Sequence, residues 1–210
     1  MQALYRSSIV ENHFEIKVFR MKALGILQLG LAALILLGAM ASDPALAQIR
    51  PDSKFIKAIR EKDYASSYSY LVNGGNPNAR DYDGVPALFV AADLLDRSMV
   101  SELLKRGGNP DIRDRVSGET PLIRAAARGG AFVVELILAY EAQIDIEDGN
   151  GATALIKAVQ GGHLNVVKLL LENNADIEFA DYAGLSAYDH ARTSRDKRIL
   201  KVIEEHAAKN

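Results

Sequence analysis

Histidine is the side chain that titrates nearest neutral pH and binds metals most often, so the four histidines are the first candidates for chemistry. They are His13, His163, His190 and His206, and no two of them stand at the H-x-x-x-H spacing of a helical metal site. The chain has no cysteine, which excludes disulfides and thiolate metal sites. The motifs G-x-S-x-G, H-E-x-x-H and G-x-x-x-x-G-K-[ST] do not occur. The sequence therefore predicts no enzyme, no cofactor and no metal.

Carboxylates alternate with isoleucines in the stretch QIDIEDGNG, at Asp145, Glu147 and Asp148. A calcium loop of the EF-hand type needs oxygen ligands in a fixed order, and that order is absent. The alternation with Ile144 and Ile146 is explained by a loop that packs on one face and is solvated on the other. We expect no calcium site here.

Residues 148–180 form a unit with its own turn, helix-start and helix-end signals. A polar turn at 148–151 precedes a short helix, for which the Thr153 hydroxyl is a suitable cap. Gly161 and Gly162 end that helix, and a second helix is expected from about Leu164 to the Asn173-Asn174 pair. Its apolar stripe has helical spacing and consists of Val166, Val167, Leu169, Leu170 and Leu171.

The same turn and helix-end signals recur along the chain. The turn glycines are spaced 34, 33 and 33 residues apart, at Gly84, Gly118, Gly151 and Gly184. The residues that follow each second helix are spaced 33, 34 and 33 apart, at Gly74, Gly107, Glu141 and Asn174. Comparison of the two series places one extra residue between Gly107 and Gly118.

Three segments match one signature, G-x-T-P-L-H-x-A-A: GVPALFVAA from Gly84, GETPLIRAA from Gly118 and GATALIKAV from Gly151. With the period of about 33 residues, they make the chain from about Ser53 to its end resemble the ankyrin repeat family. The resemblance implies an all-α solenoid of helix-turn-helix pairs with β-hairpin-like fingers. Its ankyrin repeat domain spans 48–210, with three full repeats at 81–113, 114–147 and 148–180 between capping repeats at about 53–80 and 181–210.

The capping repeats differ from the full ones. The first lacks a leading finger and its turn glycine, and the second helix of the last, expected from Arg195 to Ala207, is rich in Lys, Arg and Glu. Polar ends favour a monomer. His163 stands at the family's Gly-His position, where a structural hydrogen bond is expected, and His190 is expected to belong to the cap. Stacking should bury the second-helix stripes, which include Leu103, Leu104, Ile137, Leu138, Leu169 and Leu170.

The N-terminal extension, residues 1–47, resembles a bacterial secretory signal peptide. Lys22 precedes an apolar run at 23–38, and the A-x-A site at 45–47 places cleavage before Gln48. Met21 offers an alternative start, and a second A-x-A site at 39–41 would move the mature end to Ser42. The alternative is an uncleaved membrane anchor, because the uncharged stretch from Ala23 to Ser42 is about 20 residues long, enough to span a bilayer.

In both interpretations the repeats lie outside the cytoplasm, since Arg20 and Lys22 keep the preceding end inside. We expect a periplasmic protein of a Gram-negative bacterium. The formal charge is −2 for the whole chain, and its cations are scattered, so nucleic acid is not expected as a partner.

The resemblance implies that the partner is another protein, bound by finger tips and the concave side of the inner helices. The tip positions are Tyr82, Asp83, Arg115, Val116, Glu119, Asn150, Ala152, Tyr182 and Leu185. The helix positions are Asp93, Leu94, Ala127, Arg128, Gln160 and Thr193. Tyr82, Arg115, Arg128 and Tyr182 are favoured as anchors, because interfaces are enriched in aromatic and arginine side chains. The alternatives are an inner-membrane-tethered adaptor and an exported effector or immunity-type binder.

Overall fold

The computed structural model describes residues 51–194 and 196–209. Residues 1–50, and with them the predicted signal peptide, lie outside the described residues. The described residues form α-helices joined by turns and loops, and two isolated antiparallel bridges pair Arg80 with Pro86 and Ala180 with Ser186. No helix of the described part is long and apolar enough to cross a membrane.

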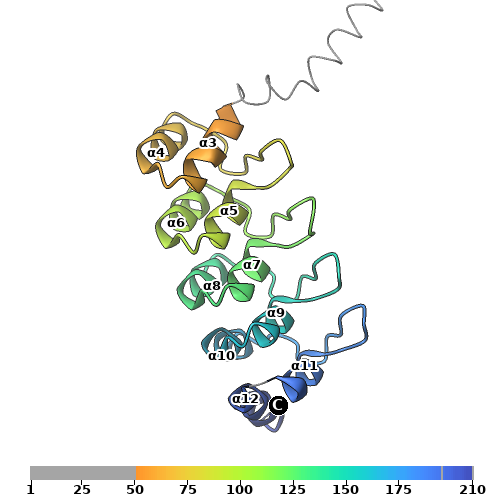
Figure 1. The fold of residues 1–210 in the computed structure, drawn as a ribbon. Helices are drawn as coiled ribbons and strands as arrows, with labels where there is room; N and C mark the ends of the chain where they lie inside the picture. Colours follow the sequence, from red (N-terminus) through yellow and green to blue (C-terminus); the bar gives the residue numbers. More distant parts are fainter. Residues whose placement is uncertain (1–50, 195, 210) are drawn as a thin grey trace, which may run out of the picture. The chain divides into compact units, whose positions relative to one another are not determined.

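Helices follow one another in pairs that stack in a single row (Figure 1). One column holds the inner helices, which lie beside the projecting loops; the other holds the outer helices (Figure 1). The inner helices are α3 (Pro51–Arg60), α5 (Ala87–Asp93), α7 (Pro121–Ala127), α9 (Ala154–Gln160) and α11 (Ala187–Thr193). The outer helices are α4 (Tyr64–Val72), α6 (Arg97–Lys105), α8 (Ala131–Leu138), α10 (Leu164–Glu172) and α12 (Lys197–Ala207).

A loop called a finger precedes each of the last four inner helices. The first to fourth fingers are residues 80–86, 113–120, 147–153 and 180–186. Within the second finger the Gly118 amide bonds to the Asp114 carbonyl four residues back, whereas Gly151 bonds to Asp148 three residues back. This confirms the prediction that the extra residue lies in the finger before Gly118.

Hydroxyl side chains start three of the inner helices. Thr153 Oγ1 accepts from Ile156 N, as predicted, and Thr120 and Ser186 cap α7 and α11 in the same way. Glu141 and Asn174 follow α8 and α10 with φ of 59° and 61°, a left-handed conformation that stops a helix. The last outer helix begins at Lys197 and not at Arg195, because the Asp196 side chain accepts from Arg198 N and caps it.

The core runs between the pairs as one apolar cluster, because each repeat covers the stripe of its neighbour. Leu103, Leu104, Ile137 and Leu170 are buried, as predicted. Leu138 and Leu169 are only partly buried, which corrects the prediction for them. His163 Nε2 donates to the Ala127 carbonyl at 3.0 Å, so its structural role is confirmed.

Candidate functional site

Each regular finger is shaped by an aspartate at its base, whose carboxylate accepts backbone N–H groups from the turn. Asp148 Oδ1 accepts from Asn150 N at 2.8 Å and from Ala152 N at 2.9 Å. Asp181 accepts from both equivalent amides of the fourth finger, and Asp81 accepts from one, Val85 N, in the first. Because the turn satisfies its own polar groups in this way, the fingers are formed before any partner arrives.

A basic side chain on the inner helix contacts the acidic group of the finger in three repeats. The pairs are Lys157 Nζ with Asp148 Oδ2 at 2.8 Å, His190 Nε2 with Asp181 Oδ2 at 2.8 Å and Arg124 with Glu119 Oε2 at 2.6 Å. Burial raises the pKa of Asp148, but the hydrogen bonds from Lys157 and the finger amides outweigh it and bring the pKa below its usual value. The hydrogen bond from His190 lowers the pKa of Asp181. These pairs fasten the fingers to the helices.

Asp81 in the first finger has a different partner. Val90 occupies the helix position that Arg124, Lys157 and His190 occupy in later repeats, and it is buried. Asp81 Oδ2 is instead held by Arg60 NH2, from the preceding repeat, at 2.6 Å. The first finger is therefore fastened to α3 of the preceding repeat.

Neighbouring fingers bond to each other through their backbones. Gly149 N donates to Ser117 O at 2.9 Å, and Tyr182 N donates to Asn150 O at 3.0 Å. The Tyr182 ring lies over Gly151 so closely that an added Cβ would stand 2.4 Å from its Cδ1. The second, third and fourth fingers thus form one continuous, rigid edge.

Most of the predicted binding residues are accessible. Tyr82 is 60% exposed and Tyr182 71% exposed, which makes them two of the largest exposed hydrophobic side chains. Asp83, Arg115, Val116, Leu185, Asn150, Gln160, Arg128 and Thr193 are also exposed, whereas Asp93, Leu94 and Ala127 are half-buried. Accessibility permits a role in binding without assigning one.

Two of the predicted tip residues are buried. Glu119 is only 8% exposed, because its carboxylate turns back to the Arg124 guanidinium. Burial raises the pKa of Glu119, and the Arg124 charge only partly offsets this. Ala152 is buried because its amide closes the turn onto Asp148. Both side chains belong to the base of their finger and not to its tip.

The structure also brings together residues that the sequence separates. Arg128 Nε lies 3.2 Å from Asp93 Oδ1, across two repeats. The Arg124 guanidinium, which the sequence did not single out, stacks 4.9 Å above the Phe89 ring and lies 3.8 Å from the same carboxylate. Its only sequence signal was its place in the signature, where Lys157 and His190 also stand. Another exposed aromatic, Phe132, lies elsewhere, on α8 under Arg97.

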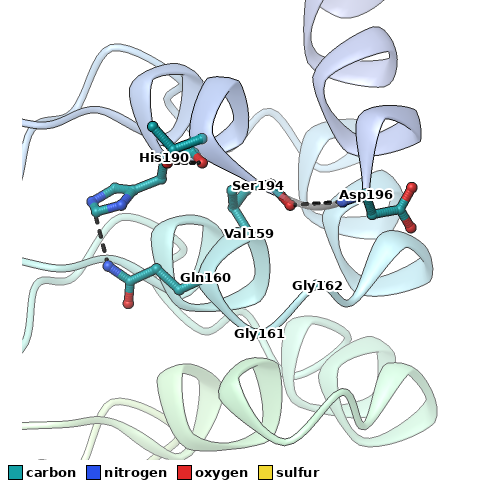
Figure 2. Close-up of a pocket in the computed structure, with 8 residues that line it drawn as sticks. Val159, Gln160, Gly161, Gly162, His190, Ser194 and Asp196 are labelled. Carbon is teal, nitrogen blue, oxygen red and sulfur yellow. Dashed lines mark hydrogen bonds between the residues drawn. The ribbon is translucent and has the colours of Figure 1, made fainter.

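An open depression of about 500 Å³ lies between the ends of α9 and α11 (Figure 2). His190 points across it toward Gln160, and its Nε2 also contacts Asp181 Oδ2 at 2.8 Å. The nearby hydroxyls are engaged elsewhere: Thr193 donates to the His190 carbonyl, and Ser194 accepts from Asp196 N. His190, which lines the depression and pairs with Asp181, has no hydroxyl nucleophile bonded to its imidazole among the described residues, and these residues contain no cluster of metal ligands.

A comparison of the sequence with models of known protein families agrees with this architecture. The model for ankyrin repeats matches three times, at residues 55–148, 88–181 and 122–208. Together the matches span most of the chain and all five helix pairs. No curated protein matches the chain. Its repeat period, its paired helices and these matches show that the chain belongs to the ankyrin repeat family.

Proposed function

We propose that this protein is an exported scaffold that binds another protein through its finger tips and the adjoining face of its inner helices. Ankyrin repeats generally mediate protein–protein interaction, which supports the class of function. The observation that carries the proposal is the continuous finger edge, on which exposed side chains from successive repeats are held in fixed positions.

Rigidity favours binding by such a surface. The finger turns are closed by their own aspartates, and the fingers are bonded to each other and to the helices. A partner therefore does not have to order the loops, and little conformational entropy is lost on association. Tyr82 and Tyr182 offer large apolar areas with few rotatable bonds, and Arg128 adds a planar donor set.

A binding role without catalysis agrees with the chemistry of the described residues. Proteins of the family are typically non-catalytic binding scaffolds. The Asp-His pair at Asp181 and His190 is used to fasten the fourth finger to α11. Its imidazole has no hydroxyl nucleophile bonded to it among the described residues. The ion pairs of this surface thus hold the fingers in place on the inner helices.

Export to the periplasm is part of the proposal and rests on the sequence of residues 1–47. The apolar run at 23–38, followed by small residues at 45 and 47, favours a cleaved signal peptide. The length of the uncharged stretch from Ala23 to Ser42 favours a second candidate, a membrane-tethered adaptor with the same binding surface. Cleavage of the signal peptide before Gln48 distinguishes the soluble scaffold from the tethered adaptor.

One preparation tests binding and export together. The full-length chain, with a C-terminal tag, is expressed in a Gram-negative host, recovered by fractionation and weighed by intact mass spectrometry. We expect a periplasmic protein that starts at Gln48 and captures one protein stoichiometrically from periplasmic extract of the source bacterium. The double variant Tyr82→Ala/Arg128→Ala should lose capture with an unchanged thermal melt.

The matched control removes one aromatic and one cation from the outer helices, as Phe132→Ala/Lys168→Ala, and should capture normally. Full capture by the Tyr82/Arg128 variant would remove that surface from the proposal. A full-length mass recovered only from membranes would replace the soluble scaffold by the tethered adaptor.

A further inference from the structure

The junction between the first and second fingers is built differently from the later junctions. Backbone bonds join the later fingers: Gly149 N donates to Ser117 O, and Tyr182 N donates to Asn150 O. No backbone hydrogen bond joins residues 80–86 to residues 113–120, all of which the structure describes. Side chains therefore join these two fingers, which lie next to each other beside α5 and α7 (Figure 1).

Two arginines make this junction. Arg80 Nη1 donates to Gly84 O in its own finger at 2.6 Å and to Arg113 O in the second finger at 2.8 Å. The stem of Arg115 packs on the same glycine, because a Cβ added to Gly84 would stand 2.5 Å from Arg115 Cδ. Both side chains thus meet at Gly84, one through a bond to its carbonyl and the other through methylene contacts.

Neither of these guanidinium groups has a carboxylate partner. Arg60 and Arg124 each have a carboxylate oxygen at 2.6 Å, whereas Arg80 and Arg115 have none within 4.0 Å among the described residues. Burial and the neighbouring Arg115 charge lower the pKa of Arg80, and the Asp114 charge only partly offsets them. The junction therefore carries positive charge that the chain does not neutralise.

Most carboxylates of the two fingers are engaged elsewhere. Asp81 and Glu119 are each held by an arginine of an inner helix. Asp114 is 5% exposed, and its Oδ2 accepts two amide N–H groups of its own turn. Asp83 is exposed and forms no ion pair with a described residue. An added anion would therefore meet guanidinium groups that are not already paired.

We infer that the junction of the first and second fingers binds an aspartate or glutamate side chain of the partner protein through Arg80 and Arg115. This inference rests on the proposed function and specifies the chemistry that the partner presents. A carboxylate matches the planar fork of a guanidinium and accepts two parallel N–H groups from it. Arg115 is exposed and offers its whole fork, and Arg80 keeps Nε and Nη2 after Nη1 has bonded the two carbonyls.

The surroundings of the two arginines favour a carboxylate on a protein. Both side chains are held before a partner arrives, Arg80 by two carbonyls and Arg115 by its packing on Gly84, so little side-chain entropy is lost on binding. Tyr82, on the same finger as Arg80, is 60% exposed and adds an apolar contact area. A long polyanion such as nucleic acid is disfavoured, because the chain has a formal charge of −2.

The probe is a capped tetraglutamate peptide. It is titrated into ¹⁵N-labelled protein recovered after expression of the full-length chain, while backbone amide and arginine Nε–H chemical shifts are followed. We expect saturable shifts at Gly84, Arg80 and Arg115 that weaken as sodium chloride is added. Arg115→Gln keeps the stem carbons that pack on Gly84 and removes the guanidinium. It should weaken binding by about tenfold with an unchanged thermal melt.

Two controls accompany the titration. A capped tetraglutamine peptide has the same length without the charges and should not bind. Lys168→Gln removes an exposed positive charge from α10 and should bind tetraglutamate as the wild type does.

Shifts that do not saturate, that map to other fingers or that persist at full strength in Arg115→Gln would overturn the inference. Saturable shifts with inorganic phosphate and none with tetraglutamate would assign the two arginines to phosphate and also overturn it. The peptide assay does not need the native partner. If the peptide fails while Tyr82→Ala/Arg128→Ala still abolishes capture, the scaffold proposal stands and this inference falls.

Discussion

Truncating Leu170 to alanine tests how stacking supports the repeats, because its neighbour in the sequence provides a matched control. Leu170 is 0% exposed in α10, within the single apolar cluster, while Leu169 is only partly buried on the same helix. Deleting a fully buried leucine side chain costs about 3 to 5 kcal/mol, since both the transfer free energy and the contacts around the cavity are lost. The same deletion at Leu169 should cost about 1 to 2 kcal/mol, because part of that side chain already contacts water.

The assay is urea unfolding followed by circular dichroism at 222 nm. With a slope of about 2 kcal/mol/M, Leu170→Ala should lower the midpoint by about 1.5 to 2.5 M, and Leu169→Ala by less than about 1 M. Both variants should keep the native spectrum before unfolding. Equal losses, or a larger loss for Leu169→Ala, would refute the assignment of the buried face of α10.

Two further predictions concern the third finger. Gly151→Ala should cost about 2 kcal/mol or more in thermal melts, because its φ is +77° and the new Cβ would meet the Tyr182 ring. Gly184→Ala has the same backbone strain with open space around it, so about 1 kcal/mol is expected, and an equal loss would contradict the contact. Asp148→Asn should destabilise the protein at pH 7. Burial raises the pKa of Asp148, but hydrogen bonds from Lys157 and the finger amides lower it more, so the net shift is downward. The stability it adds is therefore present above its unfolded pKa of about 4 and is lost as pH falls through the lower folded value. The difference between wild type and variant should shrink in acid, and a gap that stays constant from pH 7 to pH 3 would contradict the ionic role.

The parts of the fold that sequence predicted well are those that each repeat specifies for itself. The Thr153 cap, the helix stops at Glu141 and Asn174 and the longer second finger all depend on local backbone geometry. The same local sequence gives the same local geometry in each repeat, so the repeat period can be read from the spacing of the turn and cap residues. The predicted start of α12 was wrong by two residues because Asp196 competes successfully as its cap.

The candidate surface was predicted less well than the fold. Placing Glu119 and Ala152 at a finger tip was wrong, because the direction of a side chain in a turn depends on what it meets across the finger. Glu119 meets Arg124 on α7, and that pairing could not be read from the family signature. The binding roles of the exposed residues, Tyr82 and Tyr182 among them, stay predictions.

By itself, the sequence determined the repeat: its period, its two helices, its turn and the residue inserted in the second finger. Only the tertiary structure decided which charges meet. Lys157 holds the aspartate of its own repeat, whereas Asp81 is held by Arg60 from the preceding one, because Val90 leaves no cation on α5 at that position. Stacking brings residues of neighbouring repeats as close as residues within one repeat. Long polar side chains then pair with whichever opposite charge lies nearest in space. The repeat period in the sequence does not give these distances.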